Sequence, residues 1–224
     1  MQMNQLIGTG VVLALAGSSW ANSFDMSSGH ADILVGYDAG SNELEIEVEL
    51  VPGDGNFTIS PDLPNGVDVL EPNEIRFVSG AASFVPGEGV WRFGEDFAPG
   101  VLFLGWGAEE VSTGVFENDT LSFELVGITG PGNFRLFDLD QFNQEVELLP
   151  NPGTFDVFAE SADHFSFEFD AAGIYELEVR ARGTLIGGQE LVSESATLTF
   201  VIPTPGAGAL AALGLAAAAR RRRG

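Results

Sequence analysis

Strict two-residue alternation of apolar and acidic side chains is the feature that most constrains this chain. In ELEIEVEL, residues 43–50, glutamates alternate with Leu44, Ile46, Val48 and Leu50. A strand repeats every two residues and a helix every 3.6, so this pattern predicts a β-strand with one buried face. The chain must therefore provide a sheet and a core against which that face packs.

The same alternation returns near the C-terminus. Phe165, Phe167 and Phe169 alternate with polar residues, and a turn is predicted at residues 170–173. Inward positions of the following strand are Tyr175, Leu177, Val179 and Ala181. A turn at Gly187-Gly188 then leads into a strand at 196–202, so we expect a three-strand meander.

Short strands are predicted along the rest of the interior. Residues 32–37 pair with 43–50 across a turn-rich connection at 38–42. Further candidates, separated by Gly or Pro clusters, are 74–79, 90–93, 101–106, 121–126 and 134–138. With no persuasive helix between them, these segments predict an all-β fold, an antiparallel immunoglobulin-like β-sandwich. Whether the core holds one sandwich or two stays open.

Composition limits what supports the fold and what it binds. The chain has no cysteine, so packing alone must stabilise it, and 18 phenylalanines supply the packing material. Thirty-three acidic residues outnumber nine basic ones, giving a net charge of −24, and there is no lysine. Such a surface repels nucleic acid, because nucleic-acid binding requires cations that neutralise phosphates.

The N-terminus has the form of a secretory signal. Residues 6–17 are apolar, and Ser19-Trp20-Ala21 places small residues where a signal peptidase recognises them. We therefore expect residues 1–21 to be a helical signal peptide cleaved between Ala21 and Asn22. The mature β domain then covers residues 22–202.

The C-terminus consists of an extended triplet, a small apolar run and an arginine block. Pro203, Thr204 and Pro205 precede residues 206–219, which contain only Gly, Ala and Leu, and Arg220, Arg221, Arg222 and Arg223 follow. Arginines beside an apolar segment stay on the cytoplasmic side, so residues before 203 are expected outside. A glycolipid-anchor signal or a plain C-terminal anchor are the alternatives, but a glycolipid signal does not end in arginines.

This tail, residues 203–224, resembles the PEP-CTERM type of bacterial sorting signal, with Thr204 where the family has Glu. The resemblance implies a hydrophobic sorting helix that is at least transiently anchored in the membrane. It also implies an exosortase-type peptidase, besides signal peptidase, as a partner that passes the protein to the cell envelope.

The interior resembles the choice-of-anchor M domain of bacterial surface proteins. The segments that carry the resemblance are GHADILVGYD at 29–38, VLFLGWGAEEVSTGVF at 101–116, GPGNFRLF at 130–137 and DHFSFEFDAAGIYELEVRARG at 163–183. The resemblance implies an extracellular β domain coupled to a variable anchor.

Two histidines offer a candidate metal site. His30 and His164, with Asp32 or Asp163, would supply nitrogen and oxygen ligands for a divalent ion such as Zn²⁺ or Mn²⁺. The alternative places His164 on a polar strand face with Ser166 and gives His30 a strand-end hydrogen bond. Acidic loops at 38–43, 54–56, 117–119 and 138–140 offer oxygens for Ca²⁺.

Catalysis has less support. The sequence lacks a nucleophile elbow, a zinc-protease helix, a P-loop, a dinucleotide fingerprint and any cysteine nucleophile. We therefore expect an exported, non-enzymatic surface protein that acts as a structural or binding module of the bacterial envelope. The alternative is a module that binds a divalent metal or a glycan near His30 and His164, aided by exposed aromatics such as Trp91 and Trp106.

Overall fold

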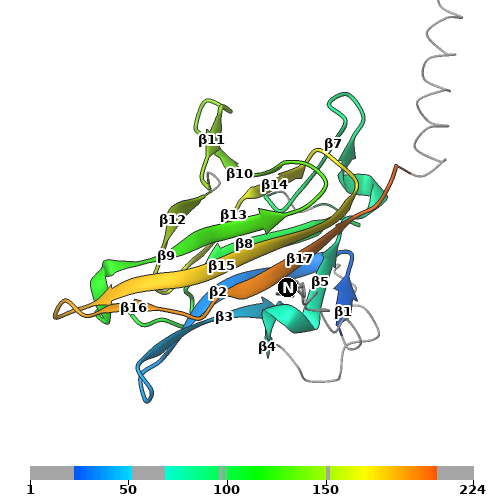
Figure 1. Ribbon diagram of the computed structural model, residues 1–224. Helices are drawn as coiled ribbons and strands as arrows, with labels where there is room; N and C mark the ends of the chain where they lie inside the picture. The colour runs from blue at the N-terminus through cyan, green and yellow to red at the C-terminus, as the bar shows by residue number, and fades with distance from the viewer. Residues whose placement is uncertain (1–22, 52–68, 96–97, 99, 150–151, 206–224) are drawn as a thin grey trace, which may run out of the picture.

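The computed structural model describes residues 23–51, 69–95, 98, 100–149 and 152–205. The predicted terminal helices, the cleavage pair Ala21 and Asn22 and the block Arg220–Arg223 lie outside these residues. Within them the secondary structure consists of strands and short 3₁₀ turns (Figure 1). The prediction of an all-β protein is confirmed.

The strands follow one another along the whole described chain. Their bounds are β1 (Phe24–Met26), β2 (Gly29–Asp38), β3 (Glu43–Leu50), β4 (Val69–Leu70), β5 (Ile75–Val78), β6 (Phe84–Val85), β7 (Val90–Phe93), β8 (Leu102–Gly107), β9 (Phe116–Thr129), β10 (Phe134–Leu139), β11 (Glu145–Glu147), β12 (Gly153–Phe158), β13 (Ala162–His164), β14 (Ser166–Phe169), β15 (Gly173–Leu185), β16 (Glu190–Val192) and β17 (Ala196–Ile202). The 3₁₀ turns η2 (Pro72–Glu74) and η3 (Ala81–Ser83) flank β5.

The described strands form three sheets. The first has the order β1-β5-β17-β15-β9-β12, with β16 also on β15. The second has the order β13-β8-β2-β3-β4, and the third β11-β10-β14-β7-β6. Most neighbours are antiparallel, but β1 with β5, β5 with β17, and β2 with β8 are parallel. The expectation of an antiparallel arrangement holds for most pairs and fails for these three, because β8 returns to β2 only after the long excursion through β3–β7.

The first predicted hairpin is confirmed. β2 and β3 pair from Ala31 opposite Leu50 to Asp38 opposite Glu43. Leu44, Ile46, Val48 and Leu50 are buried, and the glutamates lie on the opposite face, as the alternation requires.

The predicted pairing of the Phe-rich segment with the strand after it was wrong. β14 pairs with β10 and β7, whereas β15 pairs with β9, β16 and β17. Between them Asp170 accepts hydrogen bonds from the backbone nitrogen and Nδ2 of Asn133, both 2.6 Å long, and Gly173 takes a φ of 142°. The chain thus crosses between sheets, so Phe169 contacts Tyr175 edge-on, with ring centroids 4.8 Å apart.

An aromatic core joins the three sheets. Phe200 of the first sheet contacts Phe93 and Phe167 of the third, and Trp106 of the second contacts Phe123 and Phe155 of the first. The core therefore lies between the first sheet and the other two.

Trp91 and Trp106 are 4% and 0% exposed, so the expectation that these indoles are surface ligands was wrong. Each indole lies on the inward face of its strand and packs against phenylalanines instead.

The last strand of the described chain ends directly before the Pro-Thr-Pro triplet. β17 ends at Ile202, and Pro203, Thr204 and Pro205 continue without regular structure. Pro203 and Thr204 are exposed. No helix among the described residues has the length and apolar character needed to cross a membrane.

Candidate metal centre

Three predicted ligands meet on the outward face of the second sheet. His30 and Asp32 lie two residues apart on β2 and therefore point to the same side, while His164 is the last residue of β13. Gly105 of β8 is in register with both Asp32 and His164. Asp32, Gly105 and His164 thus form one row across three strands.

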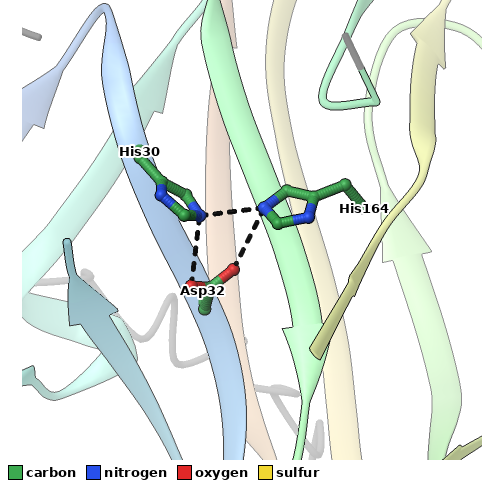
Figure 2. A group of neighbouring side chains, drawn as sticks. All are labelled: His30, Asp32 and His164. Carbon is green, nitrogen blue, oxygen red and sulfur yellow. Dashed lines mark hydrogen bonds and ion pairs between the residues drawn. The ribbon is translucent and has the colours of Figure 1, made fainter. Parts of the chain in front are cut away.

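The three side chains converge on a common point (Figure 2). Nε2 of His30 lies 2.8 Å from Nε2 of His164 and 3.2 Å from Oδ2 of Asp32. Nε2 of His164 lies 3.4 Å from Oδ1 of Asp32. The Asp32 side chain is 4% exposed, that of His30 9% and that of His164 23%, so the opening to solvent lies beside His164.

Gly105 makes this convergence possible. A Cβ atom on Gly105 would lie 1.9 Å from Oδ1 of Asp32 and 3.2 Å from Nε2 of His164. Only glycine therefore lets a side chain from β13 reach across β8 to β2. The Trp106 indole lies on the opposite face of β8, against phenylalanines.

Phe103 holds the two imidazoles in place. Its ring stacks on His164 with centroids 3.8 Å apart and planes 5° from parallel, and it lies 4.8 Å from the His30 ring. Because it is in register with His30 on the neighbouring strand, it forms an apolar wall of the site. Orientation of this kind fixes which nitrogen faces a ligand.

The electrostatic environment favours a cation. Burial, followed by the negative charge of Asp32, raises the pKa of Glu109, while His30 acts in the opposite direction. A carboxylate held in a buried position is costly unless a positive charge compensates it. The two Nε2 atoms, only 2.8 Å apart, must likewise share either a proton or another cation.

Two of the three distances suit a first-row divalent ion, and the third, between the two imidazoles, is a hydrogen-bond distance. Zn²⁺–N bonds of about 2.0–2.1 Å separate the ligand atoms of a tetrahedral site by about 3.3 Å. The three separations here are 2.8, 3.2 and 3.4 Å. Imidazole nitrogens suit Zn²⁺ and the later transition metals, while Ca²⁺ and Mg²⁺ prefer oxygen-only sites. His30, Asp32 and His164 would hold such an ion and leave one tetrahedral position open.

Asp163 and Ser166 both lie away from the two histidines. Asp163 is exposed, and its in-register neighbour is Trp106, so it faces away from the histidines. The strand breaks at Phe165, so His164 belongs to the second sheet, while Ser166 and Glu168 are buried in the third. The expectation that His164 shares their polar face was wrong.

The acidic loops use their carboxylates locally. Asp38 accepts hydrogen bonds from the backbone of Gly40 and from Ser41, and Asp140 from the backbone of Phe142 and Gln144. Asp119 accepts one from the backbone of Gly114. These bonds build turns and need no ion. The loop at 54–56 lies outside the described residues.

The comparisons with known proteins supply no family. No family model matches the chain, no curated protein matches it, and no solved structure matches it.

Sequence reasoning missed Phe103, Gly105 and Glu109 as parts of this site. The outward positions of β8 and of the residues after it, Phe103, Gly105, Gly107 and Glu109, follow the two-residue alternation. That pattern identifies their face. It does not show that β8 lies between β2 and β13, which is what makes these residues neighbours of the ligands.

Proposed function

We propose that this protein is an exported, non-enzymatic module of the bacterial cell envelope that binds a divalent transition-metal ion, Zn²⁺ in first place. The convergence of two Nε2 atoms and the buried Asp32 carboxylate on one point supports the metal-binding part. Of the neighbouring residues, Phe103 stacks on His164 and Gly105 leaves room for the ligands, and neither has a reactive side chain.

The export part of the proposal has a different basis. It rests on the signal-like residues 1–21 and the PEP-CTERM-like residues 203–224, which would be processed by signal peptidase and an exosortase-type enzyme. The exposed Pro203 and Thr204 directly after β17 suit a protease, since extended and exposed backbone is accessible to cleavage. We further propose that the domain is an immunoglobulin-like sandwich of the choice-of-anchor M type, modified by its parallel pairs.

A metal titration tests the binding function. The full chain, purified without a polyhistidine tag and stripped with chelator, is melted with increasing zinc. A ligand of the native state stabilises it by about 2.7 kcal/mol at 100 times its Kd, which corresponds to a rise in Tm of about 5–10 °C for a domain of this size. We expect zinc to have the largest effect, manganese a smaller one and calcium almost none.

Two variants separate the site from the acidic surface. Asp32→Asn removes the carboxylate charge and should abolish the zinc-dependent rise, whereas Asp163→Asn, at an exposed position beside His164, should keep it. An equal rise in both variants would assign zinc to the surface. A wild-type melt that none of the three metals moves would refute the metal-binding function.

A further inference from the structure

A groove lies where the second sheet meets the edge of the first. It has a volume of about 640 Å³, within the range of about 300–1,000 Å³ that is usual for ligand-binding clefts. Residues 43–46 of β3 line one side, and residues 192–197, which lead from β16 into β17, line the other. β3 lies beside β16 in the fold (Figure 1). None of the proposed metal ligands lines this groove, so it is a separate site.

The groove follows the edge of β3 and not one of its faces. Successive side chains of a strand point to opposite faces, so a cavity lined by the consecutive residues 43–46 must lie along the strand edge. The backbone N–H of Val51 donates to the C=O of His30, which is directly opposite in the register of β2 and β3. Hydrogen-bonded pairs alternate along an antiparallel ladder, so Leu44 and Ile46 point their N–H and C=O groups away from β2 and into the groove.

This part of the β3 edge carries no further strand among the residues that the structure describes. β4 pairs with β3 only at Val48 and Glu49, beyond the groove. On the opposite side β5 pairs with β17 from Thr199 onward, so residues 192–197 precede that ladder. An unpaired strand edge is a ready template for another strand, which would make its main-chain hydrogen bonds to Leu44 and Ile46.

The walls of the groove are acidic. The described residues that line it include no arginine, lysine or histidine but five exposed carboxylates, those of Asp38, Glu43, Glu45, Glu71 and Glu194. Leu44 and Ile46, each 5% exposed, and Val192 add apolar contacts. The groove therefore attracts a cationic partner, whereas a second copy of this chain, with its net charge of −24, is repelled.

We propose that the groove binds an extended segment of another protein in which basic and apolar residues alternate, and that this segment pairs with β3 as an additional strand. Its side chains alternate between the two faces, as those of β3 do. Basic residues then lie beside Glu43 and Glu45, and apolar residues beside Leu44 and Ile46. The chain's own arginine block at 220–223 is expected on the other side of the membrane, so it does not supply this segment.

Fluorescence anisotropy with labelled peptides tests the inference on the full chain. The parent probe is Lys-Val-Lys-Val-Lys with blocked ends, measured in chelator at about 0.15 M salt, where long-range attraction is screened. Its N-methylated form keeps every charge but cannot donate main-chain hydrogen bonds, so it should bind at least about tenfold more weakly. Glu-Val-Glu-Val-Glu should not bind.

Two double variants of equal charge separate the groove from the acidic surface. Glu43→Gln with Glu194→Gln removes one groove carboxylate from each side and should weaken binding of the parent peptide by at least about fivefold. Asp156→Asn with Glu178→Gln removes the same charge outside the groove and should weaken it by less than about twofold. All four positions are exposed, so both variants should melt at the wild-type temperature.

Either of two results would overturn strand pairing and leave only attraction to surface charge. One is equal binding of the parent and N-methylated peptides, and the other is the same loss of affinity in both double variants. A parent peptide that does not bind the wild type would overturn the inference as well. Because chelator is present throughout, these results are independent of the proposed metal-binding function, which the zinc titration tests.

Discussion

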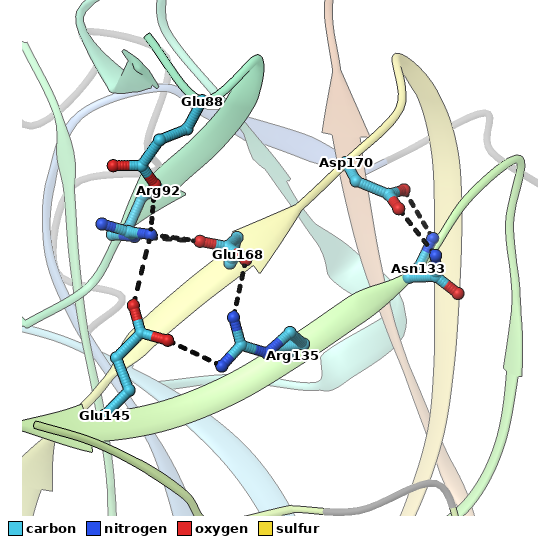
Figure 3. A network of polar contacts seen from close by, with 7 residues as sticks. All are labelled: Glu88, Arg92, Asn133, Arg135, Glu145, Glu168 and Asp170. Carbon is cyan, nitrogen blue, oxygen red and sulfur yellow. Dashed lines mark hydrogen bonds and ion pairs between the residues drawn. The ribbon is translucent and has the colours of Figure 1, made fainter.

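Two polar rows in this molecule place a buried acid on the central strand of three and differ in what flanks it. In the third sheet Glu168 of β14 lies in register between Arg135 of β10 and Arg92 of β7 (Figure 3). In the second sheet Asp32 of β2 lies between Gly105, over which His164 reaches, and Glu49. Two arginines pair with the acid of the first row, and two histidines lie beside the acid of the second.

The arginine row is complete without a ligand. Both guanidinium groups bond Glu168, Arg135 Nη1 at 3.1 Å and Arg92 Nε also at 3.1 Å, and Glu145 bridges the same pair. Both guanidinium groups also lie over the Phe137 ring, that of Arg92 5.2 Å and that of Arg135 4.9 Å from its centroid. Charge balance inside the protein thus marks a structural network. For the histidine row we propose that an external cation completes the charge balance, and the following variants test that distinction.

The largest effect on the free energy of unfolding is expected from removing the shared carboxylate of the arginine row, Glu168. Glu168→Ala leaves two guanidinium groups without their shared carboxylate. Removing one partner of a fully buried ion pair costs about 3–5 kcal/mol, and the partly exposed arginines here reduce this to about 2–3 kcal/mol. Urea denaturation measures the loss, which should be the same with zinc and with chelator. Glu178→Ala, an exposed position on β15, should change stability by less than about 0.5 kcal/mol. A loss that zinc restores would contradict the structural role of this row.

A smaller effect on the free energy of unfolding is expected from adding a side chain at Gly105 in the histidine row. Gly105→Ala places a methyl group where the Asp32 carboxylate lies, so Asp32 must move, and overpacking of this kind costs about 1–3 kcal/mol. The zinc-dependent rise in Tm should disappear as well. Gly127→Ala is the matched control in β9, because a Cβ atom there meets no atom within 4 Å. If Gly105→Ala binds zinc as tightly as the wild type, the ion lies elsewhere.

The smallest effect on stability is expected at Glu47, on the acidic face of β3 beside the site. Burial, followed by the charges of Glu110, Glu45, Glu49 and Glu71, raises the pKa of Glu47 to about 7 from its ordinary 4.5. The folded state therefore holds this proton more tightly than the unfolded state, so the contribution of Glu47 is intact below pH 4.5 and is lost as the pH rises through about 7.

Melting curves in chelator check this contribution. Glu47→Gln should raise Tm at pH 8 by at most about 2 °C and leave it unchanged at pH 4, because an uncharged amide removes the repulsion only where the wild type is ionised. Glu43→Gln, at an exposed position on the same strand, should have little effect at either pH. If Glu47→Gln raised Tm more at pH 4 than at pH 8, the direction assigned to the pH dependence of Glu47 would be wrong.

A strand was predictable from the sequence where one of its faces is buried and the other is exposed to solvent. β3 and β15 have complete two-residue alternation, and the structure has them at the expected residues. The pairing of β14 was not predictable, because its face carries the buried Ser166 and Glu168 and it pairs with β10 and β7 instead of with the next strand. Local pattern identifies a strand, but the choice of partner depends on contacts between distant segments.

The sequence by itself determined that this chain is all-β, strongly acidic and free of cysteine, and that its histidines and Asp32 were the candidate ligands. Alternation and composition are local quantities and can be read without knowing the fold. Only the tertiary structure decided that β8 lies between β2 and β13, which brings residues 134 positions apart to within 2.8 Å across Gly105. Ligand geometry depends on strand order and register, which the packing of the whole core selects.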